Sequence, residues 1–168
     1  MFSKINDEVY VSGDAVTTFS HEELAFLKAR AAENPRRRVR LCAHASSDDL
    51  LHEMLIVHAR GNYVPPHRHN GKSESFHMIE GRLKIVLFDD GGNIDRVVDM
   101  AAGDPDKTVF YRLSAPIYHT VIALSDFVVF HETTNGPFRR EDMEFAPWAP
   151  AETAPAEEQR KYIENLGV

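Results

Sequence analysis

Two histidines and a glutamate in the middle of the chain have the spacing of a metal site. His67 and His69 stand two residues apart, so both side chains lie on one face if this segment is extended. The turn-like residues 70–73 follow and would bring the chain back, which places Glu74 at the start of the next strand near the two imidazoles. Imidazole and carboxylate groups together bind divalent metal ions. The sequence therefore predicts a metal site at His67, His69 and Glu74.

The elements that must position these residues are β-strands. Between residues 39 and 134 the chain is rich in Val, Ile, Phe and Tyr, in short runs bounded by turn residues. Residues 88–93 contain Asp-Gly and Gly-Gly and predict a hairpin connection. Several short strands joined by short turns are typical of a sandwich, jelly roll or barrel. The candidate strands are residues 38–44, 52–59, 75–79, 83–88, 95–100, 108–113, 119–123 and 127–133.

Helices are expected on either side of this β-region. Ser20 and Glu23 have the spacing of a capping box, and Asn34-Pro35 cannot continue a helix, so the sequence predicts a helix over residues 21–33. A second helix is expected over residues 156–166, with acidic residues in its first turn. Trp148, the one tryptophan, is expected to hold the C-terminal tail against the barrel.

Length and composition limit the alternatives. With 168 residues, the chain is expected to form one domain, residues 1–168, with a barrel core at about 38–140, an N-terminal extension at 1–37 and a C-terminal tail at 141–168. Nine histidines stand against a single cysteine, which excludes a disulfide framework and a cysteine-rich zinc site. The net charge of -7 argues against nucleic-acid binding, and no long apolar run predicts a membrane span. The first residues do not resemble a secretory signal, so a cytoplasmic location is expected.

A family resemblance follows from the spacing of the central segment. Gly-x5-His-x-His-x4-Glu-x6-Gly, from Gly61 to Gly81, matches the first signature motif of the cupin superfamily at every fixed position. This resemblance implies an all-β fold, a double-stranded β-helix or jelly-roll cupin barrel, here with an N-terminal helical extension and a C-terminal helix. It also implies that His67, His69 and Glu74 bind a metal inside the barrel.

The fourth ligand comes from the same resemblance. In cupins a second motif supplies another histidine, and His119 is the candidate here, although the match is partial: Pro116 is present, the internal glycine is absent, and Ala123 stands where asparagine is usual. At a finer level the segments PHRHNGKSESFHMIEG, FHETTNGPF and FAPW resemble the WbuC-type cupin-fold metalloproteins, which are linked to surface-polysaccharide gene clusters. That family has no settled reaction.

Three further residues are candidates for moving a proton at the metal. His131 and Glu132 are adjacent late in a strand, so at most one of them normally faces the barrel interior. Tyr63 shares the strand parity of His67 and His69. For His131 and Glu132 a hydrogen bond at the strand end is the simpler interpretation. His77, an odd number of residues after Glu74, should point away from the metal. Lys72, Tyr63 and Tyr118 lie close in sequence to the ligands and could touch a substrate, and the parity of Tyr63 makes it the best candidate of the three.

These residues favour an enzyme that uses one divalent metal ion, Fe, Mn, Ni or Zn, as a Lewis acid on a small sugar-like or hydroxy-acid substrate. An isomerase or epimerase fits the resemblance to polysaccharide-cluster proteins, and an Fe(II) dioxygenase is an alternative. A non-catalytic module that binds a small carbohydrate or acid through the metal also stays open. A homodimer is expected from the exposed sheet edges. The basic run 36–40 is either an anion-binding patch or a solvated loop leading into a strand.

Overall fold

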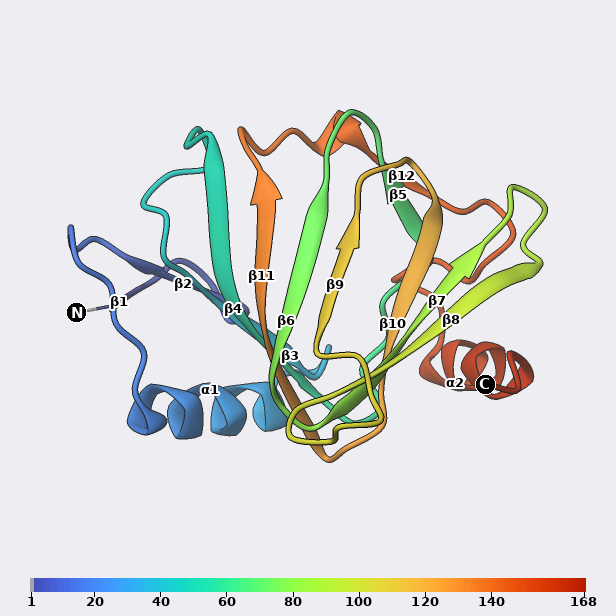
Figure 1. Cartoon of the computed structure of the whole chain (residues 1–168), viewed down its shortest axis with the longest axis horizontal. Helices are drawn as coiled ribbons and strands as arrows, with labels where there is room; N and C mark the ends of the chain where they lie inside the picture. Colours follow the sequence, from blue (N-terminus) through green and yellow to red (C-terminus); the bar gives the residue numbers. More distant parts are fainter. Residues whose placement is uncertain (1) are drawn as a thin grey trace.

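Two β-sheets face each other in the computed structural model, which describes residues 2–168 (Figure 1). The larger sheet has the order β1-β2-β3-β4-β11-β6-β9, and the smaller has the order β12-β5-β10-β7-β8. The strands of the larger sheet are Phe2–Lys4 (β1), Val9–Ser12 (β2), Arg38–Cys42 (β3), Leu51–Ala59 (β4), Phe127–Asn135 (β11), Glu74–Glu80 (β6) and Phe110–Leu113 (β9). Those of the smaller sheet are Met143–Phe145 (β12), His67–His69 (β5), Tyr118–Ala123 (β10), Arg82–Phe88 (β7) and Ile94–Ala101 (β8).

The path of the chain between the sheets defines the fold. From β4 to β11 the chain passes from one sheet to the other at every connection except the hairpin that joins β7 to β8. The strand sets β4-β11-β6-β9 and β5-β10-β7-β8 therefore form a jelly roll, a double-stranded β-helix. The predicted fold class is confirmed, including the helix before the barrel, α1 (His21–Glu33), and the helix after it, α2 (Ala156–Asn165).

Local sequence signals account for most of the element boundaries. Each of the eight predicted strands is present, with ends that differ by a few residues. Helix α1 has the predicted bounds, and its capping box is complete: Ser20 caps the first turn while the Glu23 carboxylate accepts from the Ser20 backbone N–H at 2.7 Å. Strands β1, β2 and β12 were not among the predicted strands, and β5 is the segment around His67 and His69 whose extended form the metal-site prediction assumed. The parallel pairing of β2 with β3 makes the N-terminal extension part of the larger sheet.

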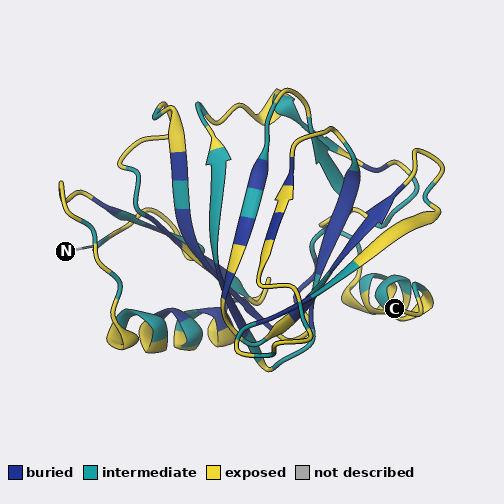
Figure 2. Cartoon of the chain, viewed as in Figure 1, coloured by how far each residue is buried: buried dark blue, intermediate teal, exposed yellow. Residues whose placement is uncertain are grey.

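Buried residues lie on strands of both sheets (Figure 2), and the side chains of the largest buried cluster come from both. Phe76, Leu83, Ile85, Val128 and Phe130 are among the side chains that fill this inner core. A second apolar layer lies outside the larger sheet, where α1 covers β3 and β4. Alternation along β3, β4 and β11 decides which residues enter which layer, because neighbouring residues of a strand face opposite sides.

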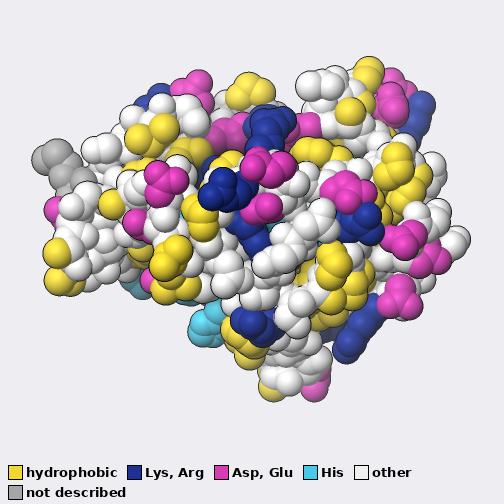
Figure 3. Space-filling view, turned by 90° about the horizontal axis from the view of Figure 1, so that it is seen from above, with side chains coloured by type: hydrophobic (Ala, Val, Ile, Leu, Met, Phe, Trp, Pro, Cys, Tyr) yellow, Lys and Arg dark blue, Asp and Glu magenta, His cyan; other side chains and the backbone are white. Residues whose placement is uncertain are grey.

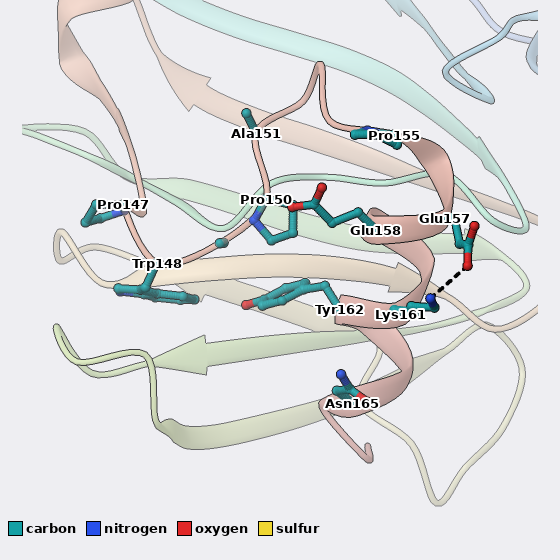
Figure 4. Close-up of a pocket in the computed structure, with 11 residues that line it drawn as sticks. Pro147, Trp148, Pro150, Ala151, Pro155, Glu157, Glu158, Lys161, Tyr162 and Asn165 are labelled. Carbon is teal, nitrogen blue, oxygen red and sulfur yellow. Dashed lines mark ion pairs between the residues drawn. The ribbon is translucent and has the colours of Figure 1, made fainter.

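The C-terminal tail is held against the smaller sheet by Trp148, as predicted. Its ring centroid lies 5.0 Å from that of Phe88 and 5.9 Å from that of Tyr118, and its indole lies over Gly92. Figure 4 shows Trp148 and Tyr162 on the tail and α2, with the 2.7 Å ion pair of Lys161 and Glu157. The short 3-10 helix Arg140–Asp142 (η1) leads into β12.

Gly81 makes the turn from β6 to β7, and replacing it with a larger residue should destabilise the fold. Its φ of +80° is unfavourable for a residue with a side chain, and an added Cβ would overlap the Phe127 carbonyl oxygen. We expect Gly81→Ala to lower the free energy of unfolding by about 3 kcal/mol, measured by denaturant titration. Gly103→Ala is the control, because Gly103 has a φ of +73° with open space around it, and about 1 kcal/mol is expected there. Equal losses for both variants would mean that the close approach to Phe127 contributes nothing.

His58 gives the fold a dependence on pH. Its ring is buried against Phe130, at a centroid separation of 5.4 Å, and burial lowers the pKa of His58 from 6.5 to about 4. Between pH 6.5 and 4 the unfolded chain therefore binds a proton at His58 while the folded chain does not. The free energy of unfolding is unaffected by this group above pH 6.5 and falls as the pH drops toward 4. We expect the free energy of unfolding to fall between about pH 7.5 and 4.5, measured by denaturant titration. This fall should be about 2–3 kcal/mol smaller in His58→Gln than in the wild-type chain. If the fall in His58→Gln equals that of the wild-type chain, this role of His58 is wrong. His21→Gln, on the exposed face of α1, is the matched control and should behave like the wild-type chain.

None of the helices in residues 2–168 is both long enough and apolar enough to cross a membrane. The sheet edges that could pair with a second copy are β1 and β9 of the larger sheet and β8 and β12 of the smaller sheet. Phe110 on β9 is exposed. The homodimer stays a prediction.

Candidate metal centre

Strand pairing brings the four predicted metal ligands to one end of the barrel. His67 and His69 lie on β5, and β10 pairs with β5 so that His119 stands opposite His67. Glu74 is the first residue of β6, in the other sheet, and the loop 70–73 crosses between the sheets to reach it. The histidines of β5 and β10 therefore face a carboxylate from the opposite sheet.

The ligand atoms are close enough to share one ion. The nitrogens of His67, His69 and His119 lie within 4.8 Å of one another. The Glu74 carboxylate joins two of them: Oε1 lies 2.8 Å from His119 Nε2, and Oε2 lies 3.5 Å from His69 Nε2. Three imidazoles and one carboxylate form a donor set that suits Fe(II), Mn(II), Ni(II) or Zn(II).

Backbone carbonyls orient two of the imidazoles. His67 Nδ1 donates to the Pro65 carbonyl at 2.9 Å, and His119 Nδ1 donates to the Ile117 carbonyl at 3.0 Å. This arrangement leaves the Nε2 lone pair of each ring free for a metal, which is how metal-binding histidines are commonly fixed. Pro65, the first residue of the stiff Pro65-Pro66 approach, thus contributes an acceptor as well as rigidity.

The charge balance of the cluster also fits a cation. Burial and the neighbouring His119 lower the pKa of His67 to about 3, so this ring is neutral, as a ligand must be. Burial alone would raise the pKa of Glu74, but His119 and His69 hold it below its usual range, and the carboxylate stays ionised. Burial alone would lower the pKa of His119, but the Glu74 carboxylate beside it raises it, so without a metal a proton can lie between His119 Nε2 and Glu74 Oε1, which are 2.8 Å apart. A divalent cation would take the place of this proton, because metal ligands bind in their deprotonated forms.

Glu132 faces the barrel interior and His131 does not. Glu132 has the strand parity of Val128 and Phe130, which belong to the inner core. Burial, followed by the charge of Glu74, raises the pKa of Glu132 to about 8. His131 has the opposite parity, and its Nε2 lies 3.7 Å from Glu53 on the outer face. Of the two adjacent candidates, the structure brings only Glu132 toward the metal cluster.

The structure does not bring Tyr63 to the cluster. Its hydroxyl donates to the Pro150 carbonyl at 2.7 Å, and its ring packs against Tyr162 at a centroid separation of 6.3 Å. Parity counted from His67 was misleading here, because 60–66 is a turn and an irregular segment and not a continuous strand. Tyr63 therefore fastens the tail to the barrel.

The other side chains near the motif are engaged elsewhere. The Tyr118 hydroxyl donates to Glu144 at 2.6 Å, outside the cluster. His77 is exposed on the outer face of β6, as its parity predicted. His52 and His58 are both buried, and the His52 ring stacks on His44 at 4.1 Å.

Tyr111 is a residue of this site that sequence reasoning missed. It lies on β9 beside Phe76 of β6 and points inward, and its buried hydroxyl has no hydrogen-bond partner within residues 2–168. Burial and then the nearby Glu74 charge raise the pKa of Tyr111. The alternation within Phe110–Leu113 could have indicated that Tyr111 faces inward. Tyr111 and Leu113 share a parity and are the two buried residues of the strand.

A cavity of about 340 Å³ opens beside the centre. His69 and Glu132 both line it, together with Met54, Thr134 and Lys72. A candidate metal ligand and a candidate proton carrier are thus accessible from one cavity of a size that suits a small molecule.

Comparisons with known proteins agree with the fold and leave the function open. Residues 19–100 match the family model of a domain of unknown function, DUF6016. The search of curated proteins gave no match.

Three solved structures are similar in fold. Protein SO0799 from Shewanella oneidensis is 13% identical over 61% of this chain and 66% of its own, with a TM-score of 0.50. A point mutant of Bacillus subtilis oxalate decarboxylase OxdC is 19% identical over 58% of this chain, with a TM-score of 0.47, and the match spans only 24% of that protein. The capsular polysaccharide assembling protein CapF of Staphylococcus aureus is 22% identical over 58% of this chain and 27% of its own, with a TM-score of 0.47. At 13% identity the likeness to SO0799 speaks for the fold alone, and the two matches with TM-scores under 0.5 carry no argument. The strand order of the two sheets gives this chain the jelly-roll fold of the cupins, with a candidate metal centre at one end of the barrel.

Proposed function

We propose that this protein is a metal-dependent enzyme of the isomerase or epimerase type that acts on a small hydroxy acid or sugar-like molecule. One observation carries the proposal: Glu132 points into the barrel and lines the same cavity as the metal ligand His69. A binding module needs the ligands alone, whereas an enzyme also needs a group that can move a proton within reach of the bound molecule.

Different residues of the chain would bind the metal, move the proton and hold the substrate. His67, His69, Glu74 and His119 would hold one divalent ion, which would act as a Lewis acid on an oxygen of the substrate. The Glu132 carboxylate would take a proton from a substrate carbon and return it to the same carbon or to its neighbour. Tyr111, with a free hydroxyl near Glu74, would donate a hydrogen bond to a substrate oxygen.

The experiment is hydrogen exchange into candidate substrates. The chain, loaded in turn with Mn(II), Fe(II), Ni(II) or Zn(II), is incubated in D2O with a panel of small hydroxy acids and reducing sugars. Mass spectrometry and NMR should detect deuterium at a carbon next to an oxygen, only with metal present. Binding of these molecules without exchange would instead favour the non-catalytic module, and oxygen uptake with Fe(II) would favour the dioxygenase.

The narrower resemblance to WbuC-type proteins, and with it a place in surface-polysaccharide metabolism, rests on the sequence segments quoted above. Both stay predictions, as does the cytoplasmic location. A substrate drawn from sugar metabolism would support them.

A further inference from the structure

The basic run 36–40 splits into paired and unpaired side chains. Arg36 lies 3.1 Å from Glu8 and also contacts Glu152, and Arg38 lies 3.2 Å from Glu8 and 2.7 Å from Glu152. These two arginines fasten the N-terminal extension and the tail to the barrel. The guanidinium of Arg40 makes no such pair: within residues 2–168 it has neither an ion pair nor a side-chain hydrogen bond.

Arg40 lines the cavity beside the metal centre. It alternates along β3 with the buried residues Val39 and Leu41, which pack under α1, and shares its parity with Cys42 on the inner face. The cavity extends from Arg40 and Cys42 on β3 to Glu132 on β11 and His69 on β5. Arg40 is exposed, so its guanidinium is available to a molecule that enters the cavity.

Neither acidic residue of the lining, Glu132 or Asp142, forms an ion pair with Arg40 within residues 2–168. Burial and the Glu74 charge raise the pKa of Glu132, and the charge of Arg40 lowers it only in part. Lys72 lies 3.4 Å from Asp142 and also donates to the Asn135 and Pro137 carbonyls, so this lysine and this aspartate satisfy each other. Arg139 adds a second cation on the exposed segment before η1. Figure 3 shows Lys and Arg side chains among acidic ones near the middle of the face that looks down on this end of the barrel. A chain of net charge -7 thus keeps an unpaired cation at the candidate site.

We propose that the cavity binds a small acid with two anionic ends, one held at the metal centre beside His69 and the other by the Arg40 guanidinium. This inference rests on the proposed function and adds the substrate class and a specificity-determining residue. An arginine suits the second end, because its planar fork binds a carboxylate or a phosphate through two parallel hydrogen bonds. Arg40 thereby selects a diacid or a phosphorylated hydroxy acid over an acid with a neutral tail.

The test compares acids that differ only at the second end. Calorimetric titration of the Mn(II)-loaded chain uses malate against lactate, and 3-phosphoglycerate against glycerate. A charge-assisted hydrogen-bond pair is expected to make the doubly anionic member of a pair bind about 10-fold more tightly or better in the wild-type chain. In Arg40→Gln this preference should fall to about onefold, while the lactate affinity changes by less than about twofold. The two pairs show whether the second end is a carboxylate or a phosphate.

Control variants separate the possible failures. Arg160→Gln changes the same charge on the exposed face of α2 and should keep the wild-type preference. Wild-type protein that binds both members of each pair equally, or Arg40→Gln protein that keeps the preference, would overturn the inference, and so would loss of the preference in Arg139→Gln alone. If Mn(II) binds and none of the four acids does, the inference fails while the metal centre stands. If Mn(II) itself does not bind, the proposed function fails.

Discussion

Replacing His67 or His119 with alanine should lower the affinity for a divalent metal by more than about 100-fold, since even residues that only support metal ligands contribute about 10–100-fold. Each histidine supplies one of three nitrogens that lie within 4.8 Å of one another, and each is already oriented by a backbone carbonyl. The remaining groups cannot move to replace it, because β5 and β10 fix their positions.

The measurement is elemental analysis of protein purified without added metal, followed by thermal unfolding with and without metal. Metal at about 1,000 times its dissociation constant should stabilise the wild-type chain by about 4 kcal/mol, and a chelator should remove this gain. The two variants should gain almost nothing. Circular dichroism checks that the variants fold, since His119 is fully buried and its removal leaves a space.

His77→Ala is the matched control. His77 lies in the same histidine-rich stretch, three residues after Glu74, yet it is exposed on the outer face of β6. Metal content and stabilisation should equal those of the wild-type chain. If the wild-type chain takes up no stoichiometric metal, the candidate centre is not a metal site. If only His119→Ala keeps normal affinity, the fourth ligand is not His119.

Glu132→Gln should lower the rate of hydrogen exchange about 1,000-fold without lowering metal content, because a positioned general base contributes about 10²–10⁴-fold. Glutamine keeps the size of the side chain and removes only its ability to accept and return a proton. In the metal-free chain burial raises the pKa of Glu132 to about 8, and a bound cation would lower it again. The carboxylate is the form that accepts a proton, so the exchange rate should rise with pH and level off once Glu132 is ionised.

Two further variants distinguish Glu132 from the other candidates. His131→Ala should exchange at the wild-type rate, because the imidazole lies beside Glu53 on the outer face. Tyr63→Phe should also exchange normally while losing the hydrogen bond to the Pro150 carbonyl. Loss of exchange in His131→Ala, or full activity in Glu132→Gln, would refute the assignment of Glu132 as the proton carrier.

Local sequence patterns were sufficient for most of the strands and helices and for the grouping of three candidate ligands. His67, His69 and Glu74 are close in the chain, and strand alternation together with one loop is enough to bring them together. The helix α1 begins and ends at local signals, the Ser20 capping box and the Asn34-Pro35 stop. The jelly-roll topology and the role of His119 came from the resemblance of whole motifs, and the pairing of β10 with β5 is the contact that places His119 opposite His67.

The sequence by itself determined three candidate donor residues, His67, His69 and Glu74, and most of the strands around them, since both depend on neighbouring residues. The tertiary structure decided which of several residues with similar chemistry have side chains that reach the cavity. Glu132 and His131 differ by one residue, and only the packing of the inner core shows which of them faces inward. Arg40 and Arg38 differ by two, and only the distant Glu8 and Glu152 show which one is already paired. Such choices depend on contacts between residues far apart in the chain, and no local periodicity encodes them.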